Sequence, residues 1–124
     1  MPVQSQTTRL LARTKAFSLA TIRFYSQLPK DTVAQVLGRQ LLRSATSVGA
    51  QYREAQRAKS IADFLSKTES ALQEIDETGY WLELIEDSGT GQQTATRQLR
   101  QEAVELLAIF VAITRGAKSR KLQS

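Results

Sequence analysis

The sequence predicts an all-α fold, an antiparallel up-down-up-down four-helix bundle built as a single domain over residues 1–124. Four stretches repeat large apolar residues at intervals of three and four, which is the period of one helix face. Short segments rich in proline, glycine or capping residues separate these stretches, and no alternating strand pattern occurs. We expect helices at about 5–27, 31–56, 60–87 and 91–118.

The first expected helix places Leu10, Phe17 and Phe24 seven residues apart, so that they form one apolar stripe. Neither glycine nor proline interrupts this stretch. Pro29 marks its end, because a proline disfavours the helical conformation at the residue before it.

The second expected helix begins at a capping signal in residues 30–32 and is unusual in its middle. Residues 44–50 contain no side chain larger than valine. Gly49 costs about 1 kcal/mol relative to alanine inside a helix, so we expect a compensating contact. Close approach of another helix backbone is the first interpretation, and a groove for a ligand is the alternative.

The third and fourth expected helices each follow a capping signal. Ser60 with Asp63 three residues later suits the start of the third helix, where an acidic side chain also favours the positive end of the helix dipole. The third helix carries two parallel apolar stripes, which predicts contact with two neighbours. Residues 87–91 form the clearest loop, and Thr90 with Gln93 is a second candidate capping box.

The fourth expected helix is apolar on nearly every side between residues 103 and 113. A helix that is apolar all round is buried all round, whereas a lone four-helix domain leaves each helix half exposed. We therefore expect self-association, and the basic tail at 118–124 is expected to fray. The candidate interface residues are Val104, Leu107, Ile109, Val111 and Trp81.

The composition argues against an enzyme. The chain has no cysteine and no histidine, which excludes thiolate chemistry, zinc sites with sulfur ligands and triads that need a histidine base. We expect no metal and no cofactor. Three carboxylates recur seven apart on the third helix, and salt bridging to arginines of the second helix is the preferred interpretation over a metal or acid-base site. These carboxylates are Glu69, Asp76 and Glu83, and the expected partners are Arg39, Arg43 and Arg53.

The start of the sequence lacks the basic and apolar run of a signal peptide, and segment 103–113 is too short for a membrane span of about 20 residues. A soluble, cytoplasmic protein without a membrane partner is the expectation.

Charge is distributed unevenly along the chain. Residues 1–59 hold ten Lys or Arg against two acids, and residues 60–105 hold three bases against ten acids. This pattern fits a basic surface that binds RNA or DNA. It equally fits basic and acidic helices that neutralise one another within or between subunits. The candidate nucleic-acid-binding residues are Arg39, Arg43, Arg53, Arg57 and Lys59.

Three segments resemble a known family. They are Gln-Leu-Leu-Arg-Ser-Ala-Thr-Ser-Val at 40–48, Lys-Ser-Ile-Ala-Asp-Phe at 59–64 and Glu-Ile-Asp-Glu-Thr-Gly-Tyr-Trp-Leu at 74–82. In order and spacing they are similar to the four-helix proteins encoded in intervening sequences of large-subunit ribosomal RNA. Relatives of that family include the accessory variability proteins of diversity-generating retroelements. Where the family tends to have Asn-Ile-Ala-Glu-Gly, this chain has residues 51–55, of which only Glu54 matches.

The resemblance implies a homopentameric ring of antiparallel bundles without enzymatic activity. In the retroelement branch it implies that a basic ring surface engages a reverse transcriptase and nucleic acid. The expected function is therefore a non-catalytic, oligomeric accessory protein of this kind. The alternative is a purely structural or protein-binding scaffold with no role on nucleic acid.

Overall fold

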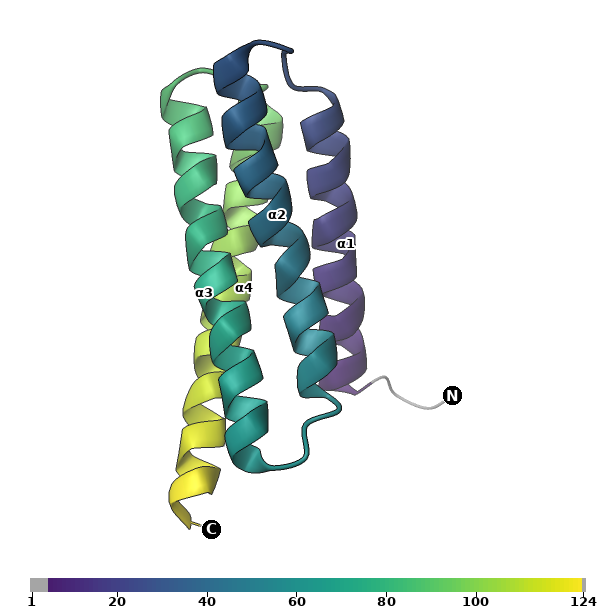
Figure 1. Cartoon of the computed structure of the whole chain (residues 1–124), viewed down its shortest axis with the longest axis vertical. Helices are drawn as coiled ribbons and strands as arrows, with labels where there is room; N and C mark the ends of the chain where they lie inside the picture. Colours follow the sequence, from purple (N-terminus) through teal and green to yellow (C-terminus); the bar gives the residue numbers. More distant parts are fainter. Residues whose placement is uncertain (1–4, 124) are drawn as a thin grey trace.

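The computed structural model describes residues 5–123, which form four helices: α1 (Gln6–Ser26), α2 (Thr32–Ala55), α3 (Ile61–Asp87) and α4 (Gln93–Gln123). They lie side by side along one long axis and are joined by short connections (Figure 1). No strand occurs among the described residues. The prediction of an all-α four-helix bundle is confirmed, while residues 1–4 and 124 of the predicted domain lie outside the described range.

Side-chain caps begin three of the helices. Asp31 Oδ1 accepts a hydrogen bond from the Ala34 amide at 3.0 Å, and Ser60 Oγ accepts one from the Asp63 amide at 3.0 Å. These bonds satisfy amides that have no partner inside the helix. The sequence predicted both caps, and Ser5 caps α1 in the same way through the amide of Thr8.

The start of α4 differs from the prediction. Gln92 Oε1 accepts from the Ala95 amide at 2.5 Å, so Gln92 supplies the cap. Thr90 is engaged elsewhere, because its hydroxyl lies 2.6 Å from that of Ser88. The predicted capping box at Thr90 is therefore wrong, since the chain is still in its turn there.

The end of α4 also differs, because the helix continues to Gln123 instead of ending near 118 and fraying. No glycine or proline follows Gly116, and Arg120 and Lys121 in the last turn favour the negative end of the helix dipole. In Figure 1 this yellow segment extends past the ends of the other helices.

The core runs along the bundle axis and is made of large apolar side chains from all four helices. Phe110 is 0% exposed, and its ring meets the ring of Tyr52 edge-on with centroids 5.3 Å apart. A buried polar contact joins α2 to α3, where the Thr78 hydroxyl donates to Ser44 Oγ at 2.8 Å. The ion pair between Glu54 and Lys67 lies further along the same seam.

The four seams are packed unequally, because α1 rests mainly on α2 and touches α4 only sparsely. A groove of about 820 Å³ follows the α1–α4 seam, with Phe17, Phe24 and Leu99 among its lining residues. The Arg13 guanidinium spans this seam and donates to both carboxylate oxygens of Glu102, at 2.7 and 2.6 Å. This bidentate pair ties α1 to α4 where apolar contact is thin.

The small residues of α2 serve helix packing, as predicted for Gly49. A Cβ placed on Gly49 would lie 3.4 Å from Thr14 Oγ1 and 3.6 Å from the Thr14 carbonyl carbon. The backbone of α1 thus comes as close to α2 as an alanine would allow. An alanine at position 49 would make ordinary van der Waals contact with α1, so this close approach accounts for a small residue there but does not require glycine.

Gly91 offers a sharp test of packing at the α3–α4 connection. A Cβ at Gly91 would lie 2.8 to 3.0 Å from side-chain atoms of Phe24, Thr96 and Ile85, which belong to three helices. We expect Gly91→Ala to lower the free energy of unfolding by about 1–3 kcal/mol, because all three neighbours must move. Urea denaturation measures the change. As the control, Gly79→Ala fills open space on α3 and should be stabilising by up to about 1 kcal/mol.

Candidate nucleic-acid interface

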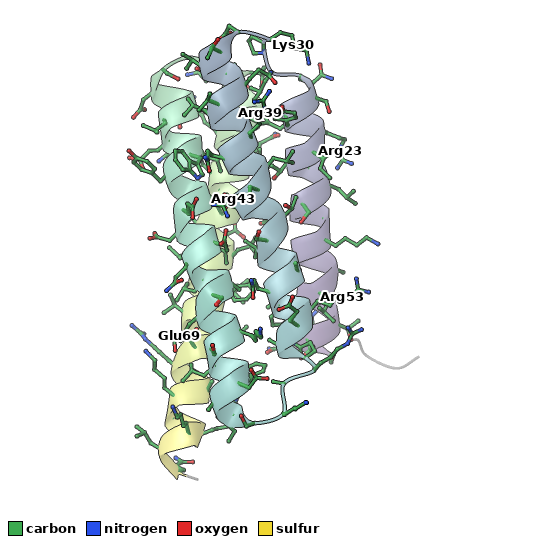
Figure 2. The ribbon with its side chains drawn as sticks, in the orientation of Figure 1. Arg23, Lys30, Arg39, Arg43, Arg53 and Glu69 are labelled. Atoms are coloured by element: carbon green, nitrogen blue, oxygen red, sulfur yellow. The ribbon has the colours of Figure 1, made fainter. Side chains whose placement is uncertain are left out.

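The exposed side of α2 and the connection after it carry the candidate cations. Arg39, Arg43 and Arg53 lie on α2, with Arg39 and Arg53 separated by about 21 Å at 1.5 Å per residue. Arg57 and Lys59 follow between α2 and α3, and all five side chains are exposed. Figure 2 shows Arg39, Arg43 and Arg53 distributed along the length of α2.

Arg43 differs from the other four because it is held by α3. Its guanidinium donates to Glu77 Oε1 and lies 3.5 Å from Glu74 Oε2. The Trp81 indole donates to the same Glu77 oxygen at 3.1 Å. The hydrogen bond from Arg43 to Glu77 raises the pKa of the arginine. Arg43 therefore joins α2 to α3, as the alternative interpretation expected.

The other four candidates have no such partner. Within residues 5–123, Arg39, Arg53, Arg57 and Lys59 form no ion pair. Their charges face solvent, which is the state that suits release of counterions from a polyanion. We call these four residues the α2 cation row.

Sequence reasoning missed two exposed cations on α1, of which Lys15 extends this surface beside Arg53, whereas Arg23 lines the groove between α1 and α4. Lys15 and Arg23 are exposed and form no ion pair within the described residues. Lys15 and Arg53 line one groove of about 460 Å³ between α1 and α2, together with Ser18 and Gly49. The available signal was that segment 5–27 contains no acidic residue at all.

Three acidic residues form ion pairs at seams away from α2. Arg13 binds Glu102 and Glu105 between α1 and α4, and Glu86 binds Arg97 and Arg100 between α3 and α4. As a result, the paired charges concentrate on the seams with α3 and α4. The α2 cation row is left with an uncompensated positive charge.

Glu86 provides a prediction about pH. Hydrogen bonds from Arg100 and then Arg97 hold the pKa of Glu86 below its ordinary value. A carboxyl group with a lowered folded pKa contributes stability above its unfolded pKa of about 4.3, and this stability is lost as pH falls through the folded pKa. We expect Glu86→Gln to be less stable than wild type at pH 7 and to lose less stability on acidification below about pH 4. Urea midpoints across pH measure both, and Glu83→Gln, at a carboxylate without an ion pair, should follow the wild-type profile.

The three recurring carboxylates of α3 do not pair with α2, contrary to the prediction. Arg43 takes Glu74 and Glu77 instead, because these are the α3 carboxylates on the side that meets α2. Asp76 and Glu83 line a hollow beside α4, and Glu69 lies near the C-terminal end of α4. None of the three forms an ion pair within residues 5–123.

The candidate interface residues do not form one patch. Val104 is 60% exposed and lines the hollow between α3 and α4 with Leu107. Val111 follows on the same side of α4 by its seven-residue spacing, and it is half-buried. Ile109 is half-buried and lies seven residues after Glu102, on the side toward α1. Trp81 is half-buried on the seam between α3 and α2, where its indole meets Glu77.

The described residues assemble no metal-binding group of three or more His, Cys, Asp or Glu side chains. In this same part of the chain, none of the helices has the length and apolarity that a membrane crossing requires. The geometry thus defines a four-helix, all-α protein with a charged outer surface on which some cations are ion-paired and others, including the α2 cation row, are not.

The chain belongs to the 23S rRNA-intervening sequence protein family, whose family model matches residues 6–112. This confirms the resemblance inferred from segments 40–48, 59–64 and 74–82. A crystal structure of a protein with unknown function from the S23 ribosomal protein family of Bacteroides thetaiotaomicron is similar at 32% identity and a TM-score of 0.78. The match covers 84% of this chain and 96% of that one. No curated protein matches the chain.

Proposed function

We propose that this protein is a non-catalytic, self-associating accessory protein that binds nucleic acid through the α2 cation row. The observation that carries the proposal is the separation of charge. Arg43 is neutralised by α3, whereas Arg39, Arg53, Arg57 and Lys59 form no ion pair within the described residues. Cations without internal partners exchange their counterions for phosphates at little cost in protein contacts.

The proposal extends to assembly and partners. Antiparallel bundles in a homopentameric ring would repeat the α2 cation row on every subunit, and repetition raises avidity without new contacts. The family name refers to 23S rRNA, so RNA is the first ligand to test, with DNA beside it. By the resemblance to the accessory proteins of diversity-generating retroelements, we propose a reverse transcriptase as the protein partner.

Salt dependence tests the nucleic-acid role. Fluorescence anisotropy with labelled single-stranded and duplex RNA and DNA should show affinity that falls steeply between 50 and 200 mM salt. Four phosphate contacts predict a log–log slope of about −3 for single strands and about −3.6 for duplexes. An affinity that stays constant over this range would exclude counterion release and with it the proposal.

The second candidate is a structural or protein-binding scaffold. It is favoured by the contact of Arg43 with Glu74 and Glu77, which shows that basic α2 and acidic α3 can neutralise one another. The two candidates differ in the salt experiment, because the scaffold has no nucleic-acid affinity to lose.

A further inference from the structure

Gly79 lies in the middle of α3 with open space around it. A Cβ at this position would meet no atom within 4 Å outside its own helix backbone and chain neighbours. Glycine inside a helix is unfavourable relative to alanine, and no contact within the described chain offsets this cost at Gly79. Gly49 is different, because α1 lies against it.

The space beside Gly79 is a small hollow between α3 and α4. It has a volume of about 160 Å³, and its lining includes Asp76, Glu83, Val104 and Leu107. Val104 is 60% exposed. Arg100 lies at the hollow but is already bound to Glu86. The hollow is therefore apolar at its centre and bordered by two carboxylates without ion pairs.

The outer side of α1 has the complementary character. Leu19 and Ile22 are 43% and 44% exposed, and Lys15 lies on the same side at helical spacing. Arg23 follows Ile22 along the helix and is exposed (Figure 2), and it also lines the groove between α1 and α4. Helix α1 contains no acidic residue.

We infer that the outer side of α1 from one copy docks into the α3–α4 hollow of the next copy. Leu19 or Ile22 supplies the apolar side chain for the space at Gly79, and Lys15 and Arg23 face Asp76 and Glu83. Charge complementarity selects a second copy as the occupant, because one face has only cations and the other has unpaired acids. The inference rests on the proposed self-association and specifies its contact.

The contact joins two different surfaces, so it is head-to-tail. Such an interface closes into a ring or continues as an open chain, and it does not stop at a two-fold dimer. It uses Lys15 and Arg23 for the next subunit and includes no residue of the α2 cation row, although Arg53 lines the same groove as Lys15.

Substitution at Gly79 tests the apolar part of the contact. Gly79→Leu should fold normally, because the hollow has room for the leucine side chain within one subunit. The leucine then fills the space that the next copy would enter, so association should weaken by about tenfold or more. Gly79→Ala is the matched control and should keep association closer to wild type. Light scattering across a dilution series measures the mass, and circular dichroism checks the helix content.

Charge reversal tests the electrostatic part. Lys15→Glu/Arg23→Glu and Asp76→Lys/Glu83→Lys should each fail to associate alone, and mixing the two variants should restore association between unlike copies. A five-membered ring of the mixture retains one contact between like copies, so the restored species need not have the wild-type mass. Arg39→Glu/Arg53→Glu makes the same charge change on α2 and should assemble as wild type does.

The outcomes separate the two levels of the proposal. If the wild-type protein has the 13.8 kDa mass of one chain at all concentrations, both the proposed self-association and this contact are wrong. If the wild-type protein is oligomeric and the Gly79→Leu and charge-reversed variants keep its mass, only the proposed contact is wrong.

Discussion

Replacing the α2 cation row by glutamine is expected to lower nucleic-acid affinity on the order of 10³-fold at 50 mM salt. The variant combines Arg39→Gln, Arg53→Gln, Arg57→Gln and Lys59→Gln. Each lost phosphate contact should also reduce the salt slope by about 0.7 to 0.9, so the four together should remove about 3 to 4 units. The four side chains form no ion pair within the described residues, so the fold should be unaffected. Anisotropy at several salt concentrations measures affinity and slope together.

Two single variants on α2 form the control for this experiment. Arg39→Gln should reduce the slope by about one, because its charge faces solvent. Arg43→Gln, four residues away, should leave the slope unchanged and cost about 0–1 kcal/mol of stability through loss of the contact with Glu77. If the two variants weaken nucleic-acid binding equally, ion pairing within the protein does not decide which cations contact phosphates.

Phe110→Ala is expected to lower the free energy of unfolding by about 3–5 kcal/mol. The side chain is fully buried, and its ring contacts Tyr52 edge-on at 5.3 Å. Alanine removes that aromatic pair and leaves a cavity that surrounding helices fill only in part. The loss is a large share of the roughly 5–15 kcal/mol that stabilises an ordinary domain. Urea denaturation followed by circular dichroism measures it.

Val33→Ala is the matched control, because Val33 is an exposed residue in the first turn of α2. It should change stability by less than about 0.5 kcal/mol. A Phe110→Ala protein as stable as the Val33→Ala protein would mean that the core does not run through α4 as described.

Much of the secondary structure was predictable from local signals. Apolar spacing of three and four places Leu10, Phe17 and Phe24 on one face, and all three are buried. At Asp31 and Ser60 the capping side chain binds the backbone amide three residues later. The sequence signal for each cap is therefore also local. The predicted cap at Thr90 was wrong because the Thr90 hydroxyl lies within hydrogen-bonding distance of the Ser88 hydroxyl. Sequence rules for helix caps do not consider such a competing partner.

The surface was less predictable, because ion pairs depend on which residues of two helices stand at the same level. Arg43 and Arg39 are alike in sequence, yet only Arg43 reaches Glu77. The periodic acids Asp76 and Glu83 border α4 instead of α2. Which carboxylates of α3 face α2 depends on the rotation of α3 about its own axis, and the hydrogen bond from Thr78 to Ser44 lies at that seam.

The sequence alone determined four helices, most of their ends and most of the buried stripe of each one, although Val33, expected in the stripe of α2, is exposed. Helix formation depends on contacts within four residues, so the sequence contains that information locally. The tertiary structure decided which cations stay unpaired, where α1 and α4 separate, and that the space beside Gly79 is open. These features arise from the relative rotation and spacing of whole helices, which the packing of many distant side chains sets together.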